Sequence, residues 1–264
     1  MIAIQKCPAP PRLVRAGEEH ARELCAAYDA APELYLSGKQ KMEVRKGIYK
    51  SVRAELNACH RGKCCYCEVR FDDRKPQAYP EVEHWRPQSS YYWLAYSWDN
   101  LLLSCSFCNR TKGDQFPLKD PAARATHHGM RIDDETPAIL KPDGDKDPRD
   151  HITFRGETPK GLTTLGRRTV KVLELDSPIH AGRRDYLAEL AKKRKLCIDL
   201  MGVDDARVRP YVEDARKFVE EAVRPDKPFS AMAAAFLAAN PLPDPSAQKV
   251  MSAGGSVPGL SGEE

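Results

Sequence analysis

The sequence has no apolar run long enough to cross a bilayer. Its longest apolar stretches, such as residues 232–239, fall well short of the roughly 20 residues that a membrane helix requires. The first residues, MIAIQKCP, also do not follow the layout of a signal peptide. These two absences argue against a membrane-spanning or secreted protein, and we therefore expect a cytosolic one.

The net charge of the chain is small, and its sequence shows no internal repeat. The 42 lysines and arginines exceed the 38 aspartates and glutamates by only four, so the field of the whole molecule attracts nucleic acid weakly. Any binding to nucleic acid must then come from local patches. No internal repeat is visible, and 264 residues of which 41% are hydrophobic predict one main domain with appendages.

Cysteine is abundant, but its number, nine, is odd, and a reducing compartment disfavours structural disulfides. Two pairs have C-x-x-C spacing: Cys64 with Cys67, and Cys105 with Cys108. This spacing lets two thiolates of one tight turn bind the same tetrahedral zinc, and four thiolates leave no open position for water. The sequence therefore predicts a structural zinc site. Cys65 lies between two of the predicted ligands and could compete for the ion.

Other interpretations of the cysteines are less favoured. A thioredoxin-like redox site needs one C-x-x-C pair near a βαβ pattern, which this sequence does not show. Buried thiols that only fill space would not explain two matched pairs. The cysteines outside the pairs are interpreted as ordinary buried or partly exposed thiols: Cys7, Cys25, Cys59 and Cys197.

Outside the cysteine-rich region, hydrophobic periodicity predicts a mainly helical chain. The segments expected to be helical are 18–30, 42–60, 163–175, 181–200, 204–223 and 228–239. Residues 141–160 are rich in Pro, Gly and Asp around the run Ile152-Thr153-Phe154, which indicates a loop and a small hairpin. We therefore divide the chain into an N-terminal helical lead-in (1–60), a zinc-binding core (61–120), a hairpin with a helical region (121–240) and a tail expected to be disordered (241–264).

Between and just after the cysteine pairs lie residues suited to phosphodiester hydrolysis. In chain order they are Glu83-His84, Asn100, Asn109 and Lys112. The order C-x-x-C, E-H-x-x-P, W-x-N-L, C-x-x-C-N-x-x-K resembles the HNH endonucleases. The resemblance implies a ββα-metal core of two short strands and a helix. We expect an α+β fold in which this core lies between the N-terminal helices and a mainly helical C-terminal region.

Each central residue of this motif has an expected chemical role. His84 is the general base, because imidazole titrates near neutral pH. Glu83 and Asn109 are the ligands of a catalytic metal, and oxygen donors of this kind suit Mg²⁺ or Mn²⁺ better than zinc. Adjacent side chains on a strand point to opposite faces, so Glu83 and His84 can serve one site only where the strand ends or twists. The pair Arg86-Pro87 indicates such an ending.

Other motif residues are expected to support this chemistry. The resemblance implies that Asn100 orients the loop that carries the base. Lys112 lies three residues after Asn109, on the same face of a helix, and is a candidate for a phosphate contact. Arg86 and Arg110 are weaker candidates for the same contact. The aromatic residues of this region are expected to pack around the core: Trp85, Tyr91, Tyr92, Trp93, Tyr96 and Trp98.

The sequence departs from the commonest HNH pattern at both metal ligands. Glu83 stands where Asp is usual, and Asn109 stands where His is usual. Both residues offer an oxygen donor, but an amide binds a cation less strongly than imidazole or carboxylate does. We therefore expect modest metal affinity and an activity that depends on a partner or on DNA. Glu68, directly after Cys67, is interpreted either as a support for the zinc ligands or as a solvated side chain.

A wider part of the sequence resembles one HNH subgroup. The segments KCCYCE, VEHWRPQS, SWDNLLLSCSFCNRTKGDQFP and ILKPDGDKDPRDHITFRG are similar to the HNH nucleases of bacterial anti-phage systems, among them Septu and certain retrons. Members of that subgroup work beside an ATPase of the ABC type, so the resemblance implies such a partner. The basic run Lys192-Lys193-Arg194-Lys195, with Arg183 and Arg184, could guide DNA, although a solvated helix face or a partner surface explains it as well.

Three functions are therefore considered. The first is a metal-dependent DNA endonuclease that acts as the effector of an anti-phage system. The second is a non-catalytic zinc module that binds nucleic acid or a protein partner, although the intact Glu83, His84 and Asn109 argue against it. The third is an RNA nuclease, since the chemistry hardly differs and no base-reading helix is identifiable in the sequence.

Overall fold

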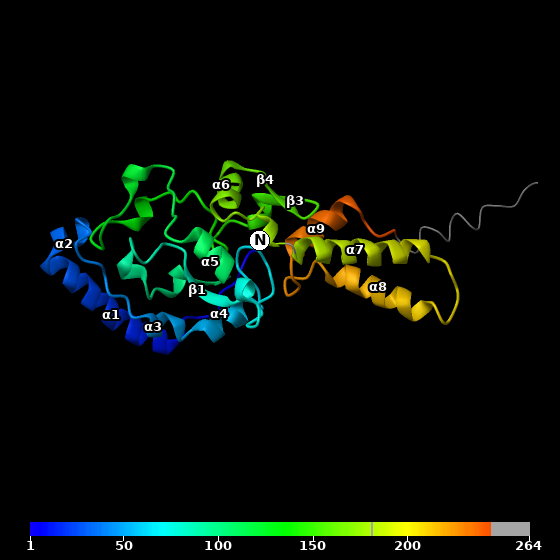
Figure 1. Cartoon of the computed structure of the whole chain (residues 1–264), viewed down its shortest axis with the longest axis horizontal. Coiled ribbons are helices and arrows are strands. Elements are labelled where there is room, and N and C mark those ends of the chain that lie inside the picture. The colour runs from blue at the N-terminus through cyan, green and yellow to red at the C-terminus, as the bar shows by residue number, and fades with distance from the viewer. Residues whose placement is uncertain (181, 244–264) are drawn as a thin grey trace, which may run out of the picture.

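Two small antiparallel sheets form the β part of an α+β fold. The computed structural model of the protein describes residues 1–180 and 182–243. The strands are β1 (Pro80–His84), β2 (Leu101–Cys105), β3 (Ile152–Arg155) and β4 (Thr158–Gly161). Strand β1 pairs with β2, and β3 pairs with β4. The predicted fold class is confirmed, and β3 and β4 form the hairpin that was expected around residues 152–154 (Figure 1).

Helices flank both sheets. They are α1 (Pro11–Ala30), α2 (Pro32–Leu36), α3 (Lys46–Lys50), α4 (Arg53–Cys59), α5 (Ser106–Lys112), α6 (Thr164–Val172), α7 (Gly182–Asp199), α8 (Arg209–Glu221) and α9 (Ser230–Ala239). Short 3-10 turns connect them at Pro76–Ala78, Tyr92–Leu94, Trp98–Asn100, Pro121–Ala123, Ile132–Asp134, Pro148–Asp150 and Pro178–His180. Helices α6 to α9 correspond to the four helices predicted in the second half of the chain.

Helix α1 begins earlier than predicted. The apolar pattern indicated a start near Glu18, whereas the helix begins at Pro11. Proline suits the first turn of a helix, because its φ angle is already helical and its missing N–H has no partner there in any case. The buried face of α1 starts with Leu13, so the helix covers more of the core than the sequence pattern indicated.

The prediction of a single helix over residues 42–60 is wrong. The chain there forms α3 and α4, which are separated at Ser51 and Val52. Apolar residues recur every four positions in this segment, and a step of four residues on a 3.6-residue helix moves each one about 40° around the axis. An unbroken helix would therefore turn its apolar stripe away from the core. The interruption instead leaves Val52 and Leu56 fully buried.

Strand β2 is buried on both of its faces. Leu101 and Leu103 pack with residues of α1 and α4, such as Leu13 and Leu56, in one hydrophobic cluster. Leu102, which points the other way, packs in a second cluster together with the paired cysteines. The strand that leads into α5 is thus fixed from both sides. Of the six aromatic residues expected to pack here, all are buried except Trp93, which is partly buried.

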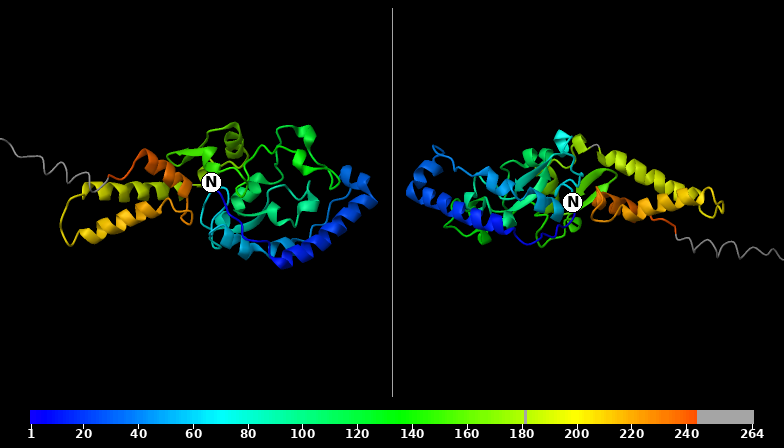
Figure 2. Two further views of the ribbon diagram at one scale, coloured as in Figure 1. Left: turned by 180° about the vertical axis from the view of Figure 1, so that it is seen from behind. Right: turned by 90° about the horizontal axis from the view of Figure 1, so that it is seen from below.

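Helices α7 and α8 lie side by side and extend away from the rest of the molecule, with α9 beside their base (Figures 1 and 2). They have a small core of their own around Leu190, Val219 and Ala233. Within the described residues, no helix is both long enough and apolar enough to span a membrane. Most of the tail expected to be disordered, residues 244–264, lies outside the described part of the chain.

Candidate active site

Four cysteines meet beside the start of α5. The Sγ atoms of Cys64, Cys67, Cys105 and Cys108 all lie within 4.8 Å of one another, and all four residues are buried. The Sγ atoms of Cys67 and Cys105 are 3.7 Å apart. A tetrahedral zinc with Zn–S bonds of about 2.3 Å requires sulfur atoms about 3.8 Å apart. The cluster is therefore consistent with the structural zinc that the sequence predicted.

The thiol of Cys65 lies outside this four-sulfur group. Burial raises the pKa of Cys65 well above its usual range, which keeps the thiol protonated. The backbone N–H of Cys65 donates to the carbonyl oxygen of Leu103 at 3.1 Å. Cys65 thus attaches the first cysteine pair to β2 through its backbone.

Glu68 is buried rather than solvated, and its backbone N–H donates to the carbonyl oxygen of the predicted zinc ligand Cys64 at 3.1 Å. Its carboxylate is buried, accepts a hydrogen bond from the hydroxyl of Ser230 at 2.8 Å and lies 3.3 Å from the ammonium of Lys63. Ser230 is the first residue of α9. Glu68 therefore connects the zinc-binding turn to the C-terminal helices, a contact between residues 162 positions apart that the sequence pattern did not indicate.

One face of α5 lies against one face of β1. Lys112 Nζ is 2.7 Å from Glu83 Oε1, and three residues earlier Asn109 Nδ2 donates to Glu81 Oε2 at 2.5 Å. Residues two apart on a strand share a face, and residues three apart on a helix lie close together, so the two contacts are consecutive. Tyr66 donates a weaker hydrogen bond of 3.4 Å to the same oxygen of Glu83. Glu81 was not identified from the sequence, although its position two residues before Glu83 was a usable signal.

Glu83 is deeply buried in this arrangement. Burial raises the pKa of its carboxyl group to about 7, although the ammonium of Lys112 acts in the opposite direction. Lys112 itself is fully buried, and its Nζ also donates to the backbone oxygen of His84 at 2.8 Å. The expectation that Lys112 contacts a phosphate is therefore not supported. In this structure the lysine neutralises Glu83 and anchors the end of β1.

His84 directly follows Glu83 and is the last residue of β1, so its side chain lies where the strand ends. Its Nε2 lies 2.8 Å from the carbonyl oxygen of Ala95, and its ring packs edge-on against Tyr49 at a centroid distance of 4.6 Å. Burial lowers the pKa of His84 to about 4. The imidazole is consequently neutral at pH 7, and because a carbonyl only accepts, the ring proton is on Nε2. Nδ1 is then the unprotonated nitrogen.

Asn100 fixes the loop that follows His84. Its Oδ1 accepts from the backbone N–H of Arg86 at 2.8 Å, while its Nδ2 donates to the carbonyl oxygens of Arg86 at 3.0 Å and Leu94 at 3.2 Å. Arg86 follows His84 by two residues, and Leu94 directly precedes Ala95, whose carbonyl holds the imidazole. These contacts are those of an orienting residue, which is the role that the resemblance implied for Asn100.

The two arginine candidates for a phosphate contact differ in exposure. Arg86 is buried, pairs with the carboxylate of Glu135 and lies over the ring of Phe116 at 4.9 Å from its centroid. Its guanidinium is therefore committed to the core, which argues against a direct contact with nucleic acid. Arg110 is exposed on α5, one residue beyond Asn109. Of the lysine and arginine candidates of the motif, Arg110 alone is open to solvent.

The basic residues of α7 are largely paired. Lys193 contacts Asp214 at 2.9 Å and Lys195 contacts Asp199 at 2.6 Å. Arg194 donates to the carbonyl oxygen of Asn240 at 2.7 Å. This pattern favours a solvated helix face over a DNA guide. Arg183, at the start of the same helix, is buried and donates to the backbone oxygen of Leu175.

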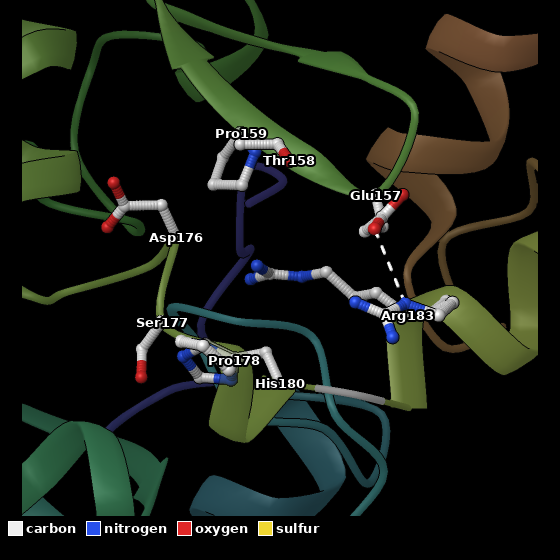
Figure 3. Close-up of a pocket in the computed structure, with 9 residues that line it drawn as sticks. Glu157, Thr158, Pro159, Asp176, Ser177, Pro178, His180 and Arg183 are labelled. Carbon is white, nitrogen blue, oxygen red and sulfur yellow. Dashed lines mark ion pairs between the residues drawn. The ribbon is translucent and has the colours of Figure 1, made fainter.

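A cavity of about 130 Å³ lies between the turn of the β3–β4 hairpin and the start of α7. Figure 3 shows Glu157, Asp176, His180 and Arg183 among its lining residues, and Arg184 pairs with Glu157 at 3.5 Å. The lining carries charges of both signs and contains none of the motif residues. The motif residues lie instead on β1, on α5 and in the 3-10 turn at Trp98–Asn100 that leads into β2.

These elements are those of a ββα-metal core, and residues 64–115 match the HNH endonuclease family. The segment is an HNH endonuclease domain that contains both cysteine pairs and every motif residue from Glu83 to Lys112. The catalytic candidates Glu83, His84 and Asn109 all lie in this domain. They do not contact one another directly through their side chains in the described structure.

Beyond the domain, the chain is homologous to two curated proteins, both named Septu protein PtuB. The protein of Bacillus mycoides (strain KBAB4) is 34% identical over 164 residues, which cover 55% of this chain and 52% of the relative. The protein of Bacillus thuringiensis is 34% identical over 125 residues, which cover 47% of this chain and 41% of the relative. The chain thus spans about half the length, or less, of the curated relatives it matches.

Proposed function

We propose that this protein is a metal-dependent HNH endonuclease that hydrolyses DNA phosphodiester bonds with His84 as the general base. The observation that carries the proposal is the hydrogen bond from His84 Nε2 to the carbonyl oxygen of Ala95. It fixes the ring and leaves Nδ1 as the proton acceptor, and because burial lowers the pKa of the imidazole to about 4, Nδ1 is unprotonated at neutral pH. Nδ1 would take a proton from water as the water oxygen attacks phosphorus and the bond to the leaving oxygen breaks.

The catalytic metal would be held by Glu83 and Asn109. Tyr66 and Lys112 both contact Oε1 of Glu83, and no hydrogen bond to Oε2 is found among the described residues. The Oδ1 atom of Asn109 likewise has no such bond within the described chain, since its Nδ2 faces Glu81. One carboxylate oxygen and one amide oxygen fit Mg²⁺ or Mn²⁺, which prefer oxygen donors. Bound there, the cation would supply Lewis-acid stabilisation of the phosphate charge.

Three further residues have supporting roles in this proposal. Asn100 holds the backbone at Arg86 and Leu94, after the base, and Lys112 anchors the end of β1 through the backbone oxygen of His84. Arg110, exposed beside Asn109, is the candidate for a contact with the DNA backbone. The zinc-bound cysteines would maintain the shape of the core without taking part in the chemistry.

We also propose that the protein is the nuclease of an anti-phage defence system and acts beside an ATPase of the ABC type. The support is the homology to Septu protein PtuB over about half the chain. Cleavage would then depend on the partner, which agrees with a metal site that contains an amide ligand. Phage infection of cells that carry the protein together with an ATPase of the ABC type, with and without the His84→Ala substitution, tests this role.

Purified protein tests the chemistry directly. With Mg²⁺ or Mn²⁺, and with the ATPase present, it should nick or linearise plasmid DNA, and His84→Ala should lower the rate by a factor of about 10² to 10⁴. His151→Ala is the matched control, because His151 lies in a different part of the fold and its side chain bonds only to Thr163 within the described residues. Full activity of His84→Ala would eliminate His84 as the base. Single-stranded DNA and transfer RNA assayed in parallel decide between DNA and RNA as the substrate.

A non-catalytic zinc module is the second candidate function. It is favoured by one observation, the ion pair in which Lys112 already neutralises Glu83. Such a module would bind nucleic acid equally well in EDTA and would show no cleavage with any divalent cation. It would also protect cells from phage as well with His84→Ala as without it.

A further inference from the structure

We infer that Glu81 is a positioning residue of the catalytic metal site, because its carboxylate fixes the orientation of the Asn109 amide. This inference rests on the proposed function, in which Asn109 is a metal ligand. The inference concerns Asn109, the weaker of the two proposed metal ligands. An amide offers a cation a neutral oxygen, and an asparagine that is not held in place can also turn its NH₂ group, which cannot bind the metal, toward the site.

The geometry defines which end of the amide faces Glu81. Asn109 Nδ2 lies 2.5 Å from Glu81 Oε2. A carboxylate has only acceptor atoms, so the group directed at it must be the NH₂ group rather than the oxygen. Oδ1 is consequently turned away from Glu81, and it forms no hydrogen bond within the described residues. The amide is thus locked with its metal-binding atom free.

The position of this contact places it at the metal site. Glu81 and Glu83 are two residues apart on β1 and share one face, while Asn109 and Lys112 are three residues apart on α5. The strand face meets the helix face in two consecutive contacts, Glu81 with Asn109 and Glu83 with Lys112. Glu81 is also only partly buried, so the contact lies at the solvent side of the fully buried pair.

The electronic effect acts in the same direction as the geometric one. A hydrogen bond donated from Nδ2 to a carboxylate draws electron density toward the amide oxygen, which makes Oδ1 a better ligand. Outer partners that orient metal ligands in this way typically contribute a factor of 10 to 100 in metal affinity. Glu81 would therefore raise the metal affinity of a site in which one ligand is a neutral amide.

The test is a titration of the full-length zinc-loaded protein with Mn²⁺ in the absence of DNA. Electron paramagnetic resonance measures the concentration of free Mn²⁺ at each step. Glu81→Leu should weaken Mn²⁺ binding by about 10- to 100-fold. Glu81→Gln should weaken it only about two- to threefold, because glutamine still accepts from Nδ2 but also permits the flipped pairing. Glu81→Thr, too short to reach Asn109, provides a second loss variant should the leucine variant fold poorly.

Asp114→Leu is the matched control for the loss of one negative charge. Asp114 is exposed just beyond α5 and forms no ion pair or side-chain hydrogen bond within the described residues. Its substitution should leave Mn²⁺ binding unchanged within about twofold. Zinc content and thermal melting of every variant confirm that the core is folded.

The outcomes separate the inference from the function on which it rests. Equal losses in Glu81→Gln and Glu81→Leu would show that Glu81 acts through its charge or binds the ion itself, and would overturn the positioning role. Unchanged binding in Glu81→Leu would overturn it as well. If wild-type protein shows no Mn²⁺ binding that depends on Glu83, the metal site of the proposed function fails instead.

Discussion

Replacing Asn100 by alanine is the sharpest perturbation of the base-carrying loop. The side chain satisfies three backbone groups: the N–H of Arg86, the carbonyl of Arg86 and the carbonyl of Leu94. Each net hydrogen bond contributes about 1 kcal/mol, and each buried group left without a partner costs about 1–3 kcal/mol. Because the Leu94 carbonyl is partly open to water, we expect a total loss of about 3–4 kcal/mol.

A loss of this size should lower the melting temperature by about 6–15 °C in a domain of this length. Asn100→Ala should also lower the cleavage rate of the protein that remains folded, beyond what the loss of stability explains. Asn100 holds Arg86, two residues after His84, and Leu94, which directly precedes Ala95, whose carbonyl orients the ring. Release of either end would misalign Nδ1, and the cleavage rate should fall about 10²-fold or more even where the protein remains folded.

The assay compares urea unfolding and plasmid cleavage of Asn100→Ala, Asn100→Asp and the surface control Asn57→Ala. The aspartate variant keeps an acceptor for the N–H of Arg86 but directs a negative charge at two carbonyl oxygens, so it should be no better than alanine. Asn57 is exposed and forms no side-chain hydrogen bond within the described residues, and its loss should be neutral. Wild-type stability and rate in Asn100→Ala would refute the reasoning.

Two further predictions concern the core. Cys108→Ser should abolish zinc binding and destabilise the HNH domain, because only three thiolates remain. Cys197 is a buried thiol outside the cluster, so the control variant Cys197→Ser should retain about one zinc per chain by metal analysis. Zinc retained in Cys108→Ser would contradict the four-cysteine site. Burial lowers the pKa of His60 from its usual 6.5 to about 4, so its contribution to folding is complete above pH 6.5 and is lost as the pH falls toward 4. The protonation of His60 should lower the free energy of unfolding by about 2 kcal/mol between pH 7 and pH 5, and His60→Asn should reduce this decline. If the free energy of unfolding of His60→Asn falls with pH as steeply as that of the wild type, His60 is not the source of the decline.

The sequence by itself determined the elements whose signal is local. Two C-x-x-C pairs identify their sulfur ligands, because the short turn between the cysteines forces both thiolates toward one point. The hairpin around Ile152 and the four helices of the second half follow from Pro and Gly punctuation and from apolar periodicity. The supporting role of Asn100 came from its place in the motif, and its contacts agree with that role.

Which charged side chains are exposed, and can therefore contact a phosphate, depends on the tertiary structure. Lys112 and Arg86 look like phosphate contacts in the sequence, yet packing buries them against Glu83 and Glu135. The partner of Asn109 is Glu81, which lies 28 residues away along the chain. Spacing along the chain fixes which residues share a face of one helix or strand. Burial and ion pairing, in contrast, depend on which faces meet, and that is set by the packing of the whole core.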